Sequence, residues 1–367
     1  SYKTLLGSLL ALLVLAGGSL AVDPLLAALD LEADVAAVAR RFLIGISIGV
    51  LPLFASSILR NFIDSLGYTR VTMVTSLCAL PINVLLNYLL IFGKSGFPAL
   101  GGAGAGFATG FTFWCVLLIN ALIVYRLPPF RDYRVFARLY APAITAWRKQ
   151  LRIGLPIGLA IFSEVSIFSA VGVLMAGYGT AVIGAHQAAI NFASLVYMLP
   201  LSIGMALTIV VGFELGAGRP ADAKAYSYIG LGLAVAAAAV GGAGLFRYTA
   251  PVAGLYTSDP EVLELTKAFL AYAVFFQLSD AIAAPVQGAL RGYKDVKAAM
   301  VMAIISYWGV GLPAGYWLSK TTQLGPFGYW VGLIAGLAFG AVVLLGRLRR
   351  LQKKHECGFS HNQRNFQ

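Results

Sequence analysis

Apolar stretches long enough to cross a lipid bilayer follow one another along almost the whole of this chain. A membrane-spanning α-helix needs roughly 20 predominantly apolar residues, and each stretch is near or above that length. Only helices and closed barrels satisfy their backbone polar groups in lipid, and no series of short alternating segments indicates a barrel. The sequence therefore predicts an all-α polytopic membrane protein. Its ten predicted spans lie at about residues 4–22, 36–58, 71–93, 104–125, 153–176, 181–213, 227–246, 266–289, 298–319 and 326–346.

The charge of the chain follows the same organisation. Hydrophobic residues make up 59% of the sequence and charged residues only 11%, which a soluble protein of this length would not show. The net charge of +12 could indicate a nucleic-acid partner, but its distribution argues against one. With residue 1 in the cytoplasm, most of the 27 Lys and Arg residues fall in cytoplasmic segments, as the positive-inside rule requires. We therefore expect a multi-pass protein of the plasma or bacterial inner membrane, monomeric, with a cytoplasmic C-terminus and no nucleic-acid partner.

An internal repeat relates the two halves of the chain at a nearly constant offset. The first predicted span pairs with the seventh, so both halves cross the membrane in the same direction, related by an axis along the membrane normal. The matched residues are Pro24 and Pro251, Phe42-Leu43 and Phe269-Leu270, Gly67-Tyr68 and Gly292-Tyr293, Gly101 and Gly325, and Gly104 and Gly328.

The repeat also predicts the domain organisation. Two helices of the second half have counterparts that would precede residue 1, so we expect four plus six helices here, from a six-plus-six arrangement whose first two helices this chain lacks. Either a fragment or a different gene start would explain that difference. The predicted parts are an incomplete N-terminal lobe (1–127), a cytoplasmic linker rich in Pro and Arg (128–149), a C-terminal lobe (150–350) and a polar, disordered tail (351–367).

Two carboxylates lie in the middle of predicted spans. Glu164 is about 18 Å along a helix from Arg152, and Asp280 lies between Glu264 and Arg291, near the middle of its own span. A charge at that depth costs a few kcal/mol at least and usually marks a path for ions or substrates. The alternative is a pair of neutral, hydrogen-bonded acids that only hold helices together.

Other polar and aromatic residues lie on the same helix face as Asp280, and a second set shares one face of the span 181–213. An acid combined with amides, aromatic rings and Met suits a cavity for organic cations, through charge attraction and cation–π contacts. The alternative is that the buried amides only join helices, at about 0.6 kcal/mol each. The predicted cavity-lining residues are Phe276, Gln277 and Gln287 in one span, and Gln187, Asn191, Ser194 and Met198 in another.

The sequence offers little for catalysis or for a transition metal. The cysteines (Cys78, Cys115 and Cys357) and the histidines have no metal-like spacing. A membrane-embedded enzyme would need a nucleophile or metal set inside the bilayer, and only His186 comes close. We therefore expect no enzymatic activity.

Five segments resemble the MATE family of multidrug exporters, in its NorM-like branch. Residues 153–168 (IGLPIGLAIFSEVSIF) resemble the helix that opens the second lobe of that family, and residues 184–219 resemble the helix after it. The others are residues 276–300 (FQLSDAIAAPVQGALRGYKDVKAAM), 58–73 and 97–109.

The resemblance implies two six-helix lobes around a central cleft, and export of cationic amphipathic drugs in exchange for Na⁺ or H⁺, with no other cofactor. Glu164 and Asp280 match the two acids of the family's cation site, and would bind Na⁺ if that ion drives transport. Phe276 stands where that pattern often has a Tyr, so one hydroxyl ligand is absent at this position.

A lipid-linked oligosaccharide flippase of the same superfamily is the alternative function. Its cavity should be lined with Arg and Lys that meet phosphates, and no Lys or Arg lies in the middle of a predicted span here. A purely structural membrane protein would leave the two acids unexplained. The coupling ion and the substrates stay open at this point.

Overall fold

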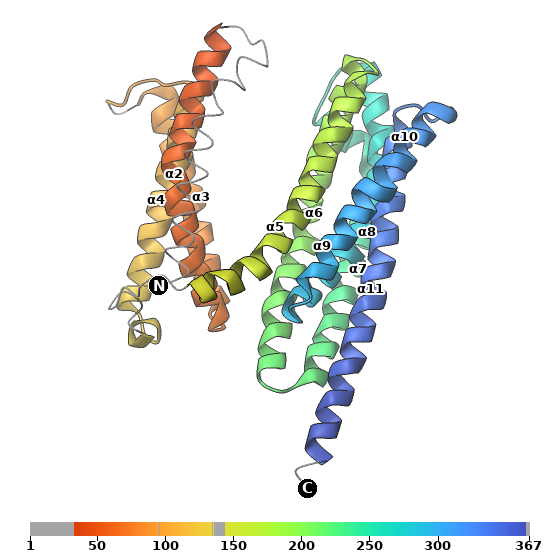
Figure 1. Cartoon of the computed structure of the whole chain (residues 1–367). Coiled ribbons are helices and arrows are strands. Elements are labelled where there is room, and N and C mark those ends of the chain that lie inside the picture. Colours follow the sequence, from red (N-terminus) through yellow and green to blue (C-terminus); the bar gives the residue numbers. More distant parts are fainter. Residues whose placement is uncertain (1–32, 95, 134, 136–143, 365–367) are drawn as a thin grey trace. The chain divides into compact units, whose positions relative to one another are not determined.

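The computed structural model describes residues 33–94, 96–133, 135 and 144–364 (Figure 1). Every regular element within these ranges is a helix. Nine of the described helical segments are long and apolar enough to cross a membrane. They correspond to nine of the ten predicted spans, and the tenth, 4–22, lies outside the described residues. The prediction of an all-α polytopic membrane protein is confirmed.

The chain divides into two compact units, Ser1–Gln150 and Leu151–Gln367, which we describe separately. The described part of the first unit contains α2 (Ala33–Ser65), α3 (Thr69–Phe92), α4 (Gly102–Arg126) and a short 3₁₀ turn, η1 (Phe130–Tyr133). Helix α4 packs against both α2 and α3. Small residues allow helices to approach closely in lipid, and Gly106 has no room for a Cβ beside the backbone of Phe42.

The second unit contains most of α5 and all the helices after it. They are α5 (Ile144–Ala176), α6 (Thr180–Gly216), α7 (Pro220–Gly254), α8 (Pro260–Gly292), α9 (Val296–Ile304), a π-helical turn η2 (Ile305–Gly311), α10 (Leu312–Thr321) and α11 (Phe327–Arg364). Helix α8 is central, since it packs against α6, α7 and α11. Segments α9, η2 and α10 follow one another without a break and form one membrane-spanning rod.

Local sequence signals explain where the central helix begins. Asp259 caps α8, because its Oδ1 accepts hydrogen bonds from the backbone N–H groups of Glu261 (2.9 Å) and Val262 (3.3 Å). Pro260 follows at the first helical position, where its missing N–H is not needed. The start of α8 is therefore fixed before its apolar span enters the membrane.

The internal repeat has a structural counterpart at the start of α4 and of α11. Gly101 (φ +55°) precedes α4, and its predicted partner Gly325 (φ +51°) precedes α11. Both have a positive φ, which glycine adopts more readily than other residues. Three residues later, Gly104 and Gly328 each lie against the backbone of the preceding helix, where a Cβ would collide. The paired glycines thus have the same two backbone roles in both units.

Two predicted boundaries are wrong. Residues 351–364, expected to be a disordered tail, continue α11 as a helix. Its buried face extends past the last apolar run, since Gln352 is only 1% exposed and the His355 ring lies 5.4 Å from that of Tyr293. The predicted linker is also shorter than 128–149, because Phe130 is buried against α2 and α4 and α5 already begins at Ile144.

Candidate functional site

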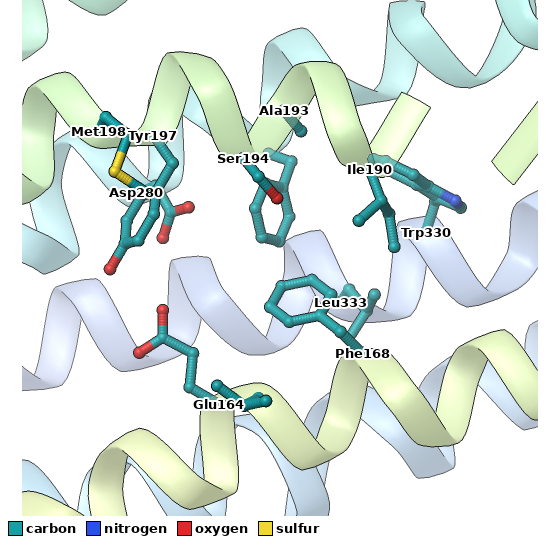
Figure 2. Close-up of a pocket in the computed structure, with 12 residues that line it drawn as sticks. Glu164, Phe168, Ile190, Ala193, Ser194, Tyr197, Met198, Asp280, Trp330 and Leu333 are labelled. Atoms are coloured by element: carbon teal, nitrogen blue, oxygen red, sulfur yellow. The ribbon is translucent and has the colours of Figure 1, made fainter. Parts of the chain in front are cut away.

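A cavity of about 190 Å³ lies among α5, α6, α8 and α11 of the second unit (Figure 2). Its polar groups are two carboxylates and two hydroxyls, and the rest of its wall is aliphatic or aromatic. All four helices belong to one unit. The lining residues are Glu164, Val165, Phe168, Ile190, Ala193, Ser194, Tyr197, Met198, Phe276, Asp280, Trp330 and Leu333.

Helix α5 brings Glu164 to the cavity from the border of its buried face. Ser163, Ile167, Val171 and Met175 are all buried and recur at helical spacing, so they define the side of α5 that faces the unit. Glu164 follows the first of them and is half-buried. Its carboxylate therefore reaches the cavity from the edge of the apolar stripe (Figure 2).

Helix α8 brings Asp280 to the cavity from the centre of the unit. Asp280 is 4% exposed, and Phe276 lies one helical turn before it on the same wall. The neighbouring Gln277 turns instead to α6, where its Nε2 donates a hydrogen bond of 2.5 Å to the carbonyl of Ala193. Gln277 thus joins two helices beside the cavity.

The two acids interact electrostatically. The charge of Glu164 acts on Asp280, and both side chains enter the same cavity in Figure 2. None of the described residues that line the cavity is Lys or Arg. A positive charge does act on Glu164 from Arg291, at the cytoplasmic end predicted for α8. The cavity wall itself is anionic when both acids are ionised.

Tyr197 of α6 is the main residue that the sequence analysis missed. Its hydroxyl hydrogen-bonds to the Glu164 carboxylate, and the charge of Asp280 also acts on it. Figure 2 shows the Tyr197 ring beside both acids. A phenol hydroxyl, absent at Phe276, is therefore supplied by another helix. The signal in the sequence was weak, because Tyr197 lies about 60° around the helix from Ser194, beyond the border of the predicted cavity face.

A buried histidine holds one aromatic wall of the cavity. The indole N–H of Trp330 donates a hydrogen bond of 3.1 Å to Nδ1 of His186, which is 0% exposed. Because an indole N–H can only donate, this Nδ1 carries no proton. The other ring nitrogen, Nε2, has no hydrogen-bond partner among the residues that the structure describes. His186 orients Trp330 and takes no part in a catalytic set.

The structure separates the predicted cavity residues into two groups. Glu164, Asp280, Phe276, Ser194 and Met198 line one cavity. Gln187, Asn191, Gln277 and Gln287 do not line it.

Depth along the helix separates Gln187 and Gln287 from the cavity, whereas Asn191 and Gln277 lie at its depth and bond to other partners. Gln187 and Met198 share a face of α6 but are about 16 Å apart along the helix axis. Asn191 accepts a hydrogen bond of 3.1 Å from the Tyr256 hydroxyl, away from the acids. Gln287 is half-buried two turns beyond Asp280. Helical periodicity alone did not show the depth of Gln187 and Gln287 or the hydrogen-bond partners of Asn191 and Gln277.

The described residues contain no group of three or more His, Cys, Asp or Glu side chains that could hold a metal ion. A cation at the two acids would therefore need neutral oxygens as further ligands. The hydroxyls of Tyr197 and Ser194 are the candidates on the cavity wall.

Comparison with known proteins gives one consistent result. A sequence model of the MatE family matches residues 1–89 and 156–317. The probable multidrug resistance protein NorM of Oceanobacillus iheyensis is 54% identical over 349 residues, which cover 95% of this chain and 78% of that protein. The NorM relative from Bacillus subtilis is also 54% identical, over 95% of this chain and 77% of its own length.

Solved structures agree on the fold. The eukaryotic MATE transporter AtDTX14 superposes with a TM-score of 0.85 at 21% identity, over 98% of this chain and 81% of its own. The Vibrio cholerae MATE transporter VcmN in its bent form gives a TM-score of 0.80 at 17% identity, over 96% of this chain and 78% of its own. The resemblance seen in the sequence is confirmed in both units, and the chain belongs to the MATE family, whose members are membrane transporters and not enzymes.

Proposed function

We propose that this protein exports cationic amphipathic compounds in exchange for Na⁺ or H⁺, and that Glu164 and Asp280 bind the coupling ion. The observation that carries this proposal is the pair of carboxylates in one cavity whose described lining contains no Lys or Arg. The names of the NorM relatives, which call them multidrug resistance proteins, support the same activity.

The electrostatics of the pair explain why it would take up a cation. Two negative charges that share a cavity of low dielectric repel each other, and their repulsion is much stronger there than in water. A bound Na⁺, a proton or a cationic group removes that repulsion. Hard cations such as Na⁺ prefer oxygen ligands, so the two carboxylates with the Tyr197 and Ser194 hydroxyls form a suitable set.

The size of the cavity favours competition between ion and substrate. Its volume of about 190 Å³ is below the range of roughly 300–1,000 Å³ that is usual for pockets enclosing a drug-sized ligand. The cavity therefore accommodates an ion or the cationic group of a substrate, beside the aromatic rings of Phe168, Phe276 and Trp330. Exchange then requires that the outward-open and inward-open states differ in their affinity for the two competitors.

The flippase alternative is not favoured. A phosphate-bearing lipid would meet two carboxylates in this cavity and no described Lys or Arg on its wall. We also propose that the protein acts as a monomer in the plasma or inner membrane with a cytoplasmic C-terminus. The basic residues after α8 and along the end of α11 fit the cytoplasmic side.

Neutral variants of the two acids test the proposed exchange. Proteoliposomes that contain the protein should expel a cationic dye when a Na⁺ or H⁺ gradient is applied, with the two gradients tested separately. Glu164→Gln and Asp280→Asn should abolish the gradient-driven component while the protein still inserts. Glu264→Gln is the matched control, because this acid of α8 is exposed and pairs with Lys267. Efflux at the wild-type rate from both neutral variants, with the same ion dependence, would refute the proposal.

A further inference from the structure

The π-helical turn η2 interrupts the rod formed by α9 and α10. Such turns are rare, and they occur frequently at functional sites. Trp308 lies in η2, about 18 Å along the rod from its start at Val296. That depth is far from the two membrane interfaces where Trp usually serves as an anchor. The position of this indole therefore needs another explanation.

The Trp308 side chain reaches the backbone of α5 next to a coupling acid. Its indole N–H donates a hydrogen bond of 3.2 Å to the carbonyl oxygen of Ser163, the residue before Glu164. Ser166 Oγ donates to the same oxygen from within α5. Over the described residues, the α5 backbone makes no extended close approach to another helix of its unit. The Trp308 bond is thus a direct link that holds α5 beside the rest of the unit.

The two residues before Trp308 contact the other sides of η2. Tyr307 is buried, and the charges of Glu164 and Asp280 both act on it. Ser306 is buried against α11, where a Cβ on Gly336 or Gly340 would collide with it. Ser306 therefore contacts α11, Tyr307 lies near the acid pair, and Trp308 bonds to α5.

We propose that η2 is a positioning element for the cation site, in which Trp308 fixes the Ser163–Glu164 peptide relative to Asp280. This inference rests on the proposed function, because it concerns the same two acids. With the N–H present, the backbone at Glu164 is held in place beside the cavity that this acid shares with Asp280. Without it, α5 still forms its own helical hydrogen bonds, but Glu164 is no longer fixed against the central helix.

The expected effect is on ion affinity rather than on maximal transport. Loss of one hydrogen bond should raise the half-saturating cation concentration about fivefold, whereas the maximal efflux rate at saturating cation stays close to that of the wild type. A residue that only filled space would lower the thermal stability or the maximal rate and leave the half-saturating concentration unchanged.

The test is dye efflux from proteoliposomes at graded Na⁺ and H⁺ gradients, together with thermal unfolding in detergent. Trp308→Phe removes the N–H, and a benzothienyl analogue of tryptophan at position 308 removes it while keeping the fused ring. The matched control is Trp317→Phe, on α10 of the same rod and 63% exposed. We expect the fivefold shift in both variants at position 308 and none in the control.

Each outcome separates the two proposals. An unchanged half-saturating concentration in both position-308 variants, with normal gradient-driven efflux by the wild type, would overturn the role of η2 alone. A loss of thermal stability without that shift would also overturn it, since it would show a purely structural tryptophan. Absence of gradient-driven efflux in the wild type would overturn the proposed function, and this inference with it.

Discussion

At the scale of single residues, the cavity depends on groups that differ in charge but lie close together. The two acids supply negative charge, and Tyr197 adds a neutral oxygen that hydrogen-bonds to Glu164. Arg291 adds a positive charge that acts on Glu164 and on Tyr197. Na⁺ affinity should therefore respond in opposite directions when the hydroxyl, a possible ligand, or the repelling guanidinium is removed.

Replacement of Tyr197 by Phe should weaken Na⁺ binding, because it removes a neutral oxygen ligand beside Glu164. If that ligand contributes as much as a hydrogen bond to a charged group, about 1.5–3 kcal/mol, the half-saturating Na⁺ concentration should rise about tenfold or more. The measurement is dye efflux at graded cation gradients. Tyr256→Phe is the matched control, because it removes a phenol that bonds to Asn191 outside the cavity. Equal shifts in both variants would contradict a specific role for Tyr197.

Replacement of Arg291 by Gln should have the opposite effect. Removal of a positive charge that acts on Glu164 makes the cavity more attractive to cations, so the half-saturating concentration should fall. Lys297→Gln serves as the control, since Lys297 is exposed at the start of α9. A rise in the half-saturating concentration, or the same fall in the control, would refute this electrostatic role.

At the scale of helices, the second unit combines one tight contact with one loose contact. The rod of α9, η2 and α10 lies directly on α11, because Gly332 faces the backbone of Gly315 and Gly336 faces that of Ser306. Small residues of this kind allow close backbone packing in lipid. Helix α5, on the other side of the cavity, makes no comparable backbone approach within the described chain.

An alanine at Gly332 should separate α11 from the rod and destabilise the unit. Its Cβ would overlap backbone atoms of Gly315, which cannot move as a side chain can. We expect a loss of about 1–3 kcal/mol and a melting temperature several degrees lower in detergent. Gly346→Ala is the matched control on the same helix, because no heavy atom lies within 4 Å of its added Cβ. Equal melting temperatures for the two variants would show that α11 and the rod are not tightly packed at Gly332.

At the scale of the whole molecule, the prediction that tests topology concerns the two ends of the second unit. With Cys78, Cys115 and Cys357 replaced by Ser, a single cysteine at Lys354 should lie in the cytoplasm, and one at Ser258 should lie outside. An impermeant maleimide should label position 258 in right-side-out vesicles and position 354 in inverted ones. Labelling of both positions from the same side would contradict the predicted orientation.

Much of this architecture was predictable because its causes are local in the sequence. The length of an apolar run specifies a spanning helix, and the cost of a buried charge marks Glu164 and Asp280 without any knowledge of packing. The cavity was less predictable, since its walls come from four helices that are far apart in the sequence. Trp330 could not be placed without the bond from its indole to His186, and the π-helical turn at Trp308 has no simple sequence signal.

The way α5 is attached has a consequence for the range of substrates. Its buried Ile167, Val171 and Met175 pack into the core of the unit, but its backbone makes no extended close approach to another described helix. Side chains adjust more readily than backbone, so α5 is the wall that can shift while α6, α8 and α11 keep their backbone contacts. Substrates of different size would then bind because one wall of the cavity, helix α5, can be displaced. The range of substrate sizes would then depend on how far α5 can move. The two acids would determine the charge of the substrates that bind.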